Sequence, residues 1–224
     1  MIRTENVNNY IEKYYIPINS EMGDLREEAE KARVPIILRE TEMFLGTFVP
    51  LIKPKKILEI GAAIGYSALY FSFLLPEVTV LSVERDDEMW EQAKLNITEY
   101  SKKDNIFVAH SDAVEFLEML QHDGEWKSEP FDLIFIDAAK SHYREFFDLV
   151  LPITKEGSFI ICDNILMKGM TSDNEMDKKH KTSIKRMRSF VDYICDIPNT
   201  DTKILSIGDG ISITKISGRF DEQN

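Results

Sequence analysis

The sequence lacks any apolar run long enough to cross a membrane, and it contains very little cysteine. No stretch approaches the roughly 20 consecutive apolar residues that a membrane-spanning helix needs. The opening segment, Met1 to Asn6, turns polar at once and lacks the apolar core of a signal peptide. Cys162 and Cys195 have no metal-type spacing, and we expect both to be reduced. These absences predict a cytoplasmic protein that has no membrane partner.

Positive charge is also scarce. The chain has 27 Lys and Arg against 39 Asp and Glu, a net charge of −12, which argues against general electrostatic coating of nucleic acid. One segment departs from this balance, because residues 178–188 (KKHKTSIKRMR) hold six basic side chains and no acid. Such a run is usually a solvated helix face, yet in so acidic a chain it is the best candidate for contacting a polyanion.

The chain length of 224 residues suits one α/β domain and is short for two. Residues 1–55 have the spacing of helices, whereas residues 56–216 alternate short apolar runs with amphipathic stretches, which predicts parallel βαβ units. The connection Gly208–Gly210 is too short for a crossover, so the last two strands should form an antiparallel hairpin. The expected strands are 56–60, 79–83, 106–110, 131–136, 158–162, 203–207 and 211–216, and the expected helices between them are 66–75, 86–100, 113–121, 143–151 and 176–195.

A glycine-containing loop follows the first expected strand. Gly61 permits a sharp turn, and the missing side chain at Gly65 should let a ligand approach the backbone. The spacing G-x-x-x-G differs from the dinucleotide fingerprint, and the Lys-Ser/Thr pair of a phosphate-binding loop is absent. The loop therefore favours a nucleoside without a pyrophosphate, and Glu59 at the strand end suits a cationic amino-acid group.

Further acidic residues follow the next two strands. Glu84 lies about 20 residues beyond the loop, where a carboxylate commonly holds a ribose diol. The step Ser111-Asp112-Ala113 is placed to meet an adenine edge. Each acid taken alone could equally cap the following helix. Three acids in successive loops at the carboxyl edge of a parallel sheet favour ligand binding.

Two later strands also end in polar residues that suit a metal ion. Asp137 follows an apolar strand with Lys140 three residues on, and Asp163-Asn164 end the next strand. If the strands are neighbours, their ends lie ~5 Å apart. Oxygen-only ligands select a hard cation such as Mg²⁺, which lowers the pKa of a coordinated hydroxyl. Lys140 could take the proton or steer the oxyanion; the alternative is helix caps with a lysine as surface partner.

Four motifs make the chain resemble the metal-dependent O-methyltransferases of the catechol and caffeoyl-CoA type: residues 58–67 (LEIGAAIGYS), 135–140 (FIDAAK), 163–169 (DNILMKG) and 207–211 (IGDGI). The resemblance implies a single domain over residues 1–224 with the class I methyltransferase Rossmann-like α/β fold. This fold has a seven-stranded, mostly parallel sheet with a C-terminal antiparallel hairpin, helices on both faces and an N-terminal helical extension, often as a homodimer.

The resemblance also implies roles for particular residues. The S-adenosylmethionine pocket would be lined by Ile37, Glu59, Gly61, Ser67, Glu84, Asp112, Ala113 and Asp137. The divalent metal, Mg²⁺ or another cation, would be held by Asp137, Asp163 and Asn164. Lys140 and Asp137 would be the catalytic residues.

The resemblance extends to the bacterial branch that methylates 5-hydroxyuridine at the wobble position of tRNA, through residues 34–36 (VPI), 60–67 and 202–210. The adjacent O5 hydroxyl and O4 carbonyl of this base could chelate a cation as a catechol does. The basic run would then contact the anticodon-arm backbone through Lys178, Lys179, Lys181, Lys185, Arg186 and Arg188. The alternatives are a small catechol-like or phenolic acceptor with the same chemistry, and a nucleoside-binding module without catalysis.

Overall fold

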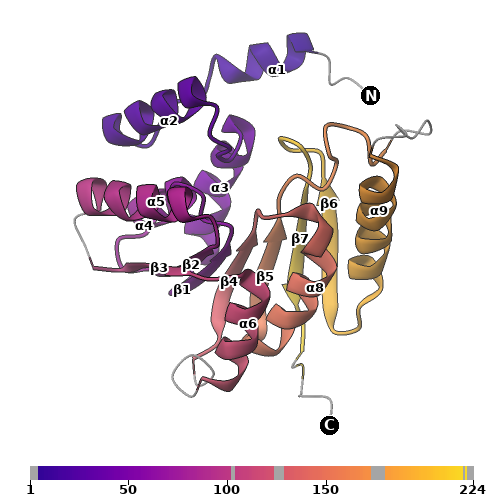
Figure 1. Cartoon of the computed structure of the whole chain (residues 1–224). Helices are drawn as coiled ribbons and strands as arrows, with labels where there is room; N and C mark the ends of the chain where they lie inside the picture. The colour runs from indigo at the N-terminus through magenta and orange to yellow at the C-terminus, as the bar shows by residue number, and fades with distance from the viewer. Residues whose placement is uncertain (1–4, 102–103, 124–128, 173–179, 219, 221–224) are drawn as a thin grey trace.

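A twisted sheet forms the middle of the protein, and helices cover both of its faces (Figure 1). The structure is a computed structural model, and it describes residues 5–101, 104–123, 129–172, 180–218 and 220. In spatial order the seven strands are β3 (Ile106–His110), β2 (Thr79–Glu84), β1 (Lys56–Ile60), β4 (Phe131–Ile136), β5 (Thr154–Cys162), β7 (Ile211–Ile216) and β6 (Thr200–Leu205).

The strand directions confirm the predicted sheet. Strands β1 to β5 run parallel to one another, and β7 lies antiparallel to both β5 and β6. The strand order reverses between β1 and β4. From β1 the chain continues to β2 and β3 on one side of the sheet, and it then crosses to β4 and β5 on the other side. A reversal of this kind opens a crevice at the carboxyl ends of the strands.

Three strands differ from their predicted bounds, and β2 does so only by including Glu84 at its end. Strand β5 starts at Thr154 instead of 158, because Thr154 pairs with Phe131 across a register shift in β4. The residues gained, Lys155 to Gly157, are exposed and carry no apolar signal. Strand β6 starts at Thr200 and ends at Leu205, because its pairing runs from Thr200–Ile216 to Leu205–Ile211 and leaves a longer connection to β7.

The helices follow the predicted order. Among the described residues they are α1 (Glu5–Glu12), α2 (Ser20–Ala32), α3 (Arg39–Ile52), α4 (Tyr66–Leu74), α5 (Asp87–Tyr100), α6 (Ala113–His122), α8 (Tyr143–Val150) and α9 (Lys181–Asp196), with the short 3-10 turns η1 (Lys140–His142) and η2 (Leu151–Ile153). Helix α9 was predicted from 176, but residues 173–179 lie outside the described part of the chain. In the described residues no helix is both long and apolar enough to cross a membrane.

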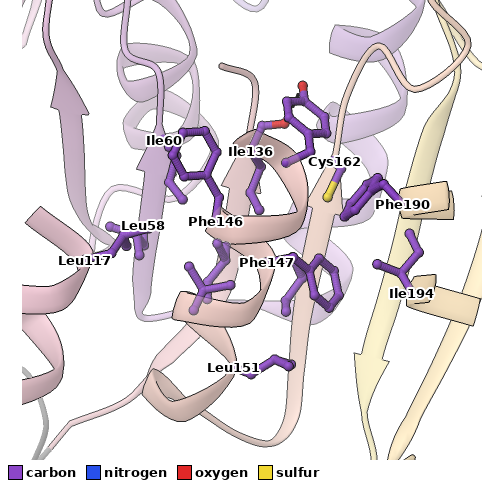
Figure 2. Packing of buried hydrophobic residues seen from close by; sticks show 14 of the residues in the cluster. Leu58, Ile60, Leu117, Ile136, Phe146, Phe147, Leu151, Cys162, Phe190 and Ile194 are labelled. Carbon is purple, nitrogen blue, oxygen red and sulfur yellow. Dashed lines mark hydrogen bonds between the residues drawn. The ribbon is translucent and has the colours of Figure 1, made fainter. Parts of the chain in front are cut away.

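Each face of the sheet has its own apolar layer. Helices α6, α8 and α9 pack on one face, where Phe146 and Phe147 of α8 and Phe190 of α9 lie against Ile136 and Cys162 of the central strands (Figure 2). The N-terminal helices α2 and α3 pack with α4 on the other face. Central strands buried on both faces explain the continuous apolar runs seen in the sequence. The layers leave the carboxyl edge of the sheet free for a site.

Candidate active site

A cavity of about 370 Å³ opens at the carboxyl ends of β1, β2 and β4. It lies beside the reversal of strand order, where open α/β sheets bind ligands. Eight of the residues that the sequence analysis singled out line it, although they are spread over a hundred positions of the chain. They are Ile37, Gly61, Ser67, Glu84, Asp112, Ala113, Asp137 and Lys140.

The two glycines of the loop after β1 have different tasks. Gly61 has a φ of +94°, and a Cβ there would lie 2.3 Å from the backbone oxygen of Asp137. Only glycine therefore lets the ends of β1 and β4 approach this closely. Gly65 has a φ of +77°, but a Cβ there would meet Ala93 and Ile97 of α5. These contacts would be 3.4 Å long, an ordinary van der Waals distance, and Gly65 does not line the cavity. The prediction that its missing side chain makes room for a ligand is thus wrong, and the positive φ is what favours glycine there.

Glu84 and Asp112 hold fixed positions on the cavity wall. One carboxylate oxygen of Glu84 accepts from the backbone N–H of Ala63 at 2.8 Å, and the other accepts from those of Arg85 and Asp86. Asp112 caps α6 by accepting from the N–H of Val114 at 2.9 Å. Helix capping and cavity lining, which the sequence posed as alternatives for Asp112, both occur. These bonds orient the carboxylates before any ligand binds.

Glu59 lies behind the cavity wall. Its side chain is completely buried, and its two oxygens accept hydrogen bonds from the hydroxyls of Ser67 and Ser82. Burial raises its pKa to about 7, although the two hydroxyl bonds oppose the shift. Of these three side chains only Ser67 lines the cavity. The predicted direct contact of Glu59 with a ligand is therefore not seen; Glu59 orients the hydroxyl that faces the ligand space.

The three predicted metal-ligating residues lie together at the ends of β4 and β5. The side-chain amide of Asn164 donates to Oδ1 of Asp137 at 3.0 Å. Oδ1 of Asp163 accepts from the backbone N–H of Asn164 at 2.7 Å, whereas its Oδ2 is buried without any hydrogen-bond partner among the described residues. Burial raises the pKa of Asp163 to about 8, and the nearby charge of Asp137 adds to the shift.

This arrangement fits a hard cation. A buried carboxylate oxygen without a partner is costly, and a divalent ion would satisfy it. The Asn164 side chain can rotate its amide to present oxygen in place of nitrogen. Only two of the three residues are carboxylates, and within the described part of the chain no group of three His, Cys, Asp or Glu side chains gathers in this way. Of the three, Asp137 alone lines the cavity.

Lys140 stands among several carboxylates. Burial raises the pKa of Asp137, Asp163 and Asp209, and the positive charge of Lys140 opposes the shift at each of them. Asp209 belongs to the connection between β6 and β7 and accepts a hydrogen bond from the backbone N–H of Lys168. The sequence predicted a hairpin connection and a family motif here, but no role for Asp209, because nothing local shows that the connection folds back toward the end of β5.

A buried ion-pair network holds the N-terminal side of the cavity. Arg26 of α2 pairs with Glu42 of α3, which also accepts from the Tyr66 hydroxyl at 2.7 Å. The same guanidinium donates to the backbone oxygen of Ile37 at 2.9 Å, and both Ile37 and Tyr66 line the cavity. In the sequence Arg26 and Glu42 look like ordinary helix surface charges, so only their burial in the folded chain reveals the network.

The basic run is only partly open to solvent. Lys178 and Lys179 lie outside the described residues. Lys181, Lys185 and Arg186 are exposed on α9, whereas Arg188 is half-buried and donates its Nε to the backbone oxygen of Thr171 at 2.8 Å. Part of the Arg188 guanidinium is therefore engaged in a hydrogen bond within the protein.

Comparison with known proteins gives consistent results. A family model described as O-methyltransferase matches residues 16–216. A caffeoyl-CoA O-methyltransferase of Populus kitakamiensis is 30% identical over 178 residues, which cover 77% of this chain and 74% of the relative. A crystal structure assigned to a caffeoyl-CoA O-methyltransferase of Staphylococcus aureus superposes with a TM-score of 0.85 at 29% identity, over 95% of this chain and 100% of the other. The O-methyltransferase of Bacillus cereus, crystallised with SAH, superposes with a TM-score of 0.81 at 25% identity over 94% and 97%.

Proposed function

The chain belongs to the O-methyltransferase family, and we propose that it moves the methyl group of S-adenosylmethionine to the O5 hydroxyl of 5-hydroxyuridine at the tRNA wobble position. S-adenosylmethionine-dependent O-methylation of the caffeoyl-CoA and catechol type follows from the family. The tRNA acceptor, the metal and the cytoplasmic setting that tRNA requires are the proposal. The observation that carries the metal-assisted chemistry is the buried oxygen of Asp163 that has no partner among the described residues. The charges of Asp137 and Lys140 both act on this carboxyl.

The cavity has suitable groups for each part of the donor. The prepositioned carboxylate of Glu84 would accept hydrogen bonds from the ribose hydroxyls, as in other sheets of this topology. Asp112 and Ala113 would face the adenine, and Ser67, held by Glu59, would face the amino-acid end. The similarity to a protein that was crystallised with SAH, the product of methyl donation, supports this assignment.

The chemistry needs an acceptor oxygen that attacks the methyl carbon while the carbon–sulfur bond breaks and its electron pair stays on sulfur. A divalent cation held by Asp137, Asp163 and Asn164, when bound, supplies the charge that lowers the pKa of the acceptor hydroxyl. Lys140 lines the same cavity and would take the hydroxyl proton or neutralise the resulting oxyanion. Asp137 both borders the cavity and belongs to the metal-binding group, so it links the two sites.

Two observations favour 5-hydroxyuridine over a small catechol. Pro35 and Ile36, which belong to the motif shared with the tRNA-modifying branch, line the cavity. The exposed basic side chains Lys181, Lys185 and Arg186 lie on α9. This helix packs beside η1, whose first residue is Lys140. The second candidate remains a small catechol-like or phenolic acceptor, which the caffeoyl-CoA relatives favour.

The decisive experiment supplies both acceptors to the purified protein with labelled S-adenosylmethionine. One arm contains tRNA with wobble 5-hydroxyuridine, the other a catechol, and each is run with Mg²⁺ and with a chelator. We expect metal-dependent conversion of the tRNA base to 5-methoxyuridine, read by mass spectrometry. Turnover of the catechol alone would establish the second candidate. Full activity in the chelated samples would contradict the role given to the metal.

A further inference from the structure

A second hollow lies between α8 and α9 and has a different character from the cavity. Its volume is about 450 Å³, and the basic residues that line it are Lys140, Arg144, Lys185 and Arg186. Among the described residues that line it none is acidic, although the chain as a whole has a net charge of −12. Two of the four cations come from the predicted basic run, whereas Arg144 comes from another helix. A concentration of one sign of charge in a hollow attracts ligands of the opposite sign.

The free cations of this hollow are on α9. Lys185 and Arg186 are exposed and have no ion-pair partner within the described residues. Arg144 uses its Nε to pair with Asp148 at 2.9 Å and lies over the ring of Tyr193. Its charge is therefore partly neutralised, and it is held in position. We expect Lys185 and Arg186 to make the strongest contacts with an anion and Arg144 to support them.

The hollow adjoins the reaction site. Lys140 lines both the hollow and the cavity, so a ligand in one lies beside a ligand in the other. Two of the residues that line the hollow are held in place by packing. Tyr143 and Phe190 are buried and meet edge to face with ring centroids 5.6 Å apart. Tyr143 also donates to the backbone oxygen of Asp163 at 2.8 Å, which connects this side of the hollow to the end of β5.

We propose that this hollow is a phosphate-binding subsite, which selects acceptors that carry a phosphate group close to the ring that is methylated. The inference rests on the proposed function, since it describes how the acceptor of that reaction is recognised. A guanidinium and an ammonium match the charge of a phosphate, and the guanidinium can bind two of its oxygens at once. The hydroxyls of Thr182 and Ser189 also line the hollow and can donate to the phosphate.

The test compares 5-hydroxyuridine with its 3′- and 5′-monophosphates as acceptors. For the wild type we expect kcat/KM to be at least about tenfold higher with one of the monophosphates, since a charge-assisted hydrogen bond is worth that much. Arg186→Ala and Lys185→Ala should each remove most of this advantage, chiefly by raising KM for the monophosphate. The position of the preferred phosphate tells on which side of the nucleotide the hollow acts.

Lys181→Ala is the matched control. Lys181 is exposed on the same helix and carries the same charge, but it does not line the hollow. The variant should keep the full preference for the monophosphate. If Lys181→Ala, Lys185→Ala and Arg186→Ala all lower it equally, the effect is diffuse electrostatic attraction and the subsite does not exist. Caffeate, whose anionic group is a carboxylate, serves as a further acceptor. If Arg186→Ala lowers kcat/KM for caffeate as much as for the monophosphate, the assignment of the hollow to phosphate is also overturned.

Failure of the subsite and failure of the proposed function give different results. If the nucleoside is methylated and a phosphate brings no gain, the function stands and the subsite is refuted. If 5-hydroxyuridine is methylated neither in tRNA nor as nucleoside or monophosphate, the function is refuted; if it is methylated in tRNA alone, the function stands. In both cases calorimetric titration with uridine monophosphate against uridine decides the subsite alone. Binding of the monophosphate that Arg186→Ala weakens about tenfold supports the subsite, whereas equal binding of both compounds refutes it.

Discussion

At the scale of single residues, the most informative atom is Oδ2 of Asp163. It is buried and has no hydrogen-bond partner among the described residues, while the other oxygen of the same carboxylate is satisfied by the backbone of Asn164. A native protein tolerates a buried oxygen without a partner where a ligand or ion supplies the missing interaction. Burial also raises the pKa of this carboxyl to about 8, so a cation would strongly favour its ionised form.

The first prediction concerns Asp163 and the metal. Addition of Mg²⁺ should raise the melting temperature of the wild type, because an ion that binds only the folded state stabilises it. Asp163→Asn should abolish this shift and methyl transfer, while the affinity for S-adenosylmethionine stays nearly unchanged, since Asp163 does not line the cavity. Differential scanning fluorimetry and calorimetric titration measure the two effects. Asp201→Asn, an exposed change in β6, serves as the control. An intact Mg²⁺ shift in Asp163→Asn would contradict the metal site.

The second prediction concerns the buried carboxyl of Glu59. Its pKa is raised from about 4.5 to about 7, so between these values the folded state keeps a proton that the unfolded state releases. The stability contributed by this proton is complete below pH 4.5 and is lost as the pH rises through about 7. The amount is on the order of 3 kcal/mol. We expect the difference in free energy of unfolding between the ligand-free wild type and Glu59→Gln to fall by this order between pH 5 and pH 8, as measured by urea titration. A difference that does not change with pH would rule out the raised pKa.

At the scale of elements, the site depends on how closely the ends of β1 and β4 approach. A Cβ added at Gly61 would collide with the backbone of Asp137, and β1 is paired with β4 up to Ile60 and Ile136. On the N-terminal side, the ion pair of Arg26 and Glu42 holds α2 against α3 and fixes Ile37 on the cavity wall. The donor cavity is thus shaped by contacts between elements, and not by one loop alone.

The third prediction tests the approach of these two strands. Gly61→Ala should destabilise the protein by more than about 2 kcal/mol and abolish binding of S-adenosylmethionine, because the added Cβ meets the Asp137 backbone at 2.3 Å. Gly157→Ala is a matched control, since Gly157 has a similar φ of +89° but no atom within 4 Å of the added Cβ. It carries the backbone strain without the clash. Equal losses in the two variants, measured by urea unfolding and calorimetry, would show that the close approach has no importance.

At the scale of the whole molecule, several exposed apolar residues lie on and just after α1. Tyr10 and Tyr14 of α1, whose rings are in contact, and Ile16 in the following link are all more than half exposed, Ile16 by 82%. In Figure 1 the helix α1 extends away from the sheet. Exposed apolar residues that gather in one region commonly mark a contact between proteins. This agrees with the homodimer that the sequence resemblance implies, which stays a prediction.

The fourth prediction tests the dimer. Light scattering after size exclusion should give the mass of two chains for the wild type and of one chain for the double variant Tyr14→Asp, Ile16→Asp, because a buried unpaired carboxylate opposes association. Phe107→Asp, which changes a 49% exposed apolar residue on the edge strand β3, should leave the dimer intact. A wild-type protein that elutes as a monomer at high concentration would refute the proposed homodimer.

The sequence by itself determined the order of strands and helices, the C-terminal hairpin and the places where the acids fall. The reason is that hydrophobic periodicity is a local property, and in a parallel sheet every strand ends at the same edge, so Glu84, Asp112 and Asp137 had to meet there. Only the tertiary structure decided which side chains line the cavity and which lie behind them. It set Ser67 before Glu59, turned Gly65 toward α5 and brought Arg144 beside Lys185, because these relations depend on packing between elements that are distant in the chain.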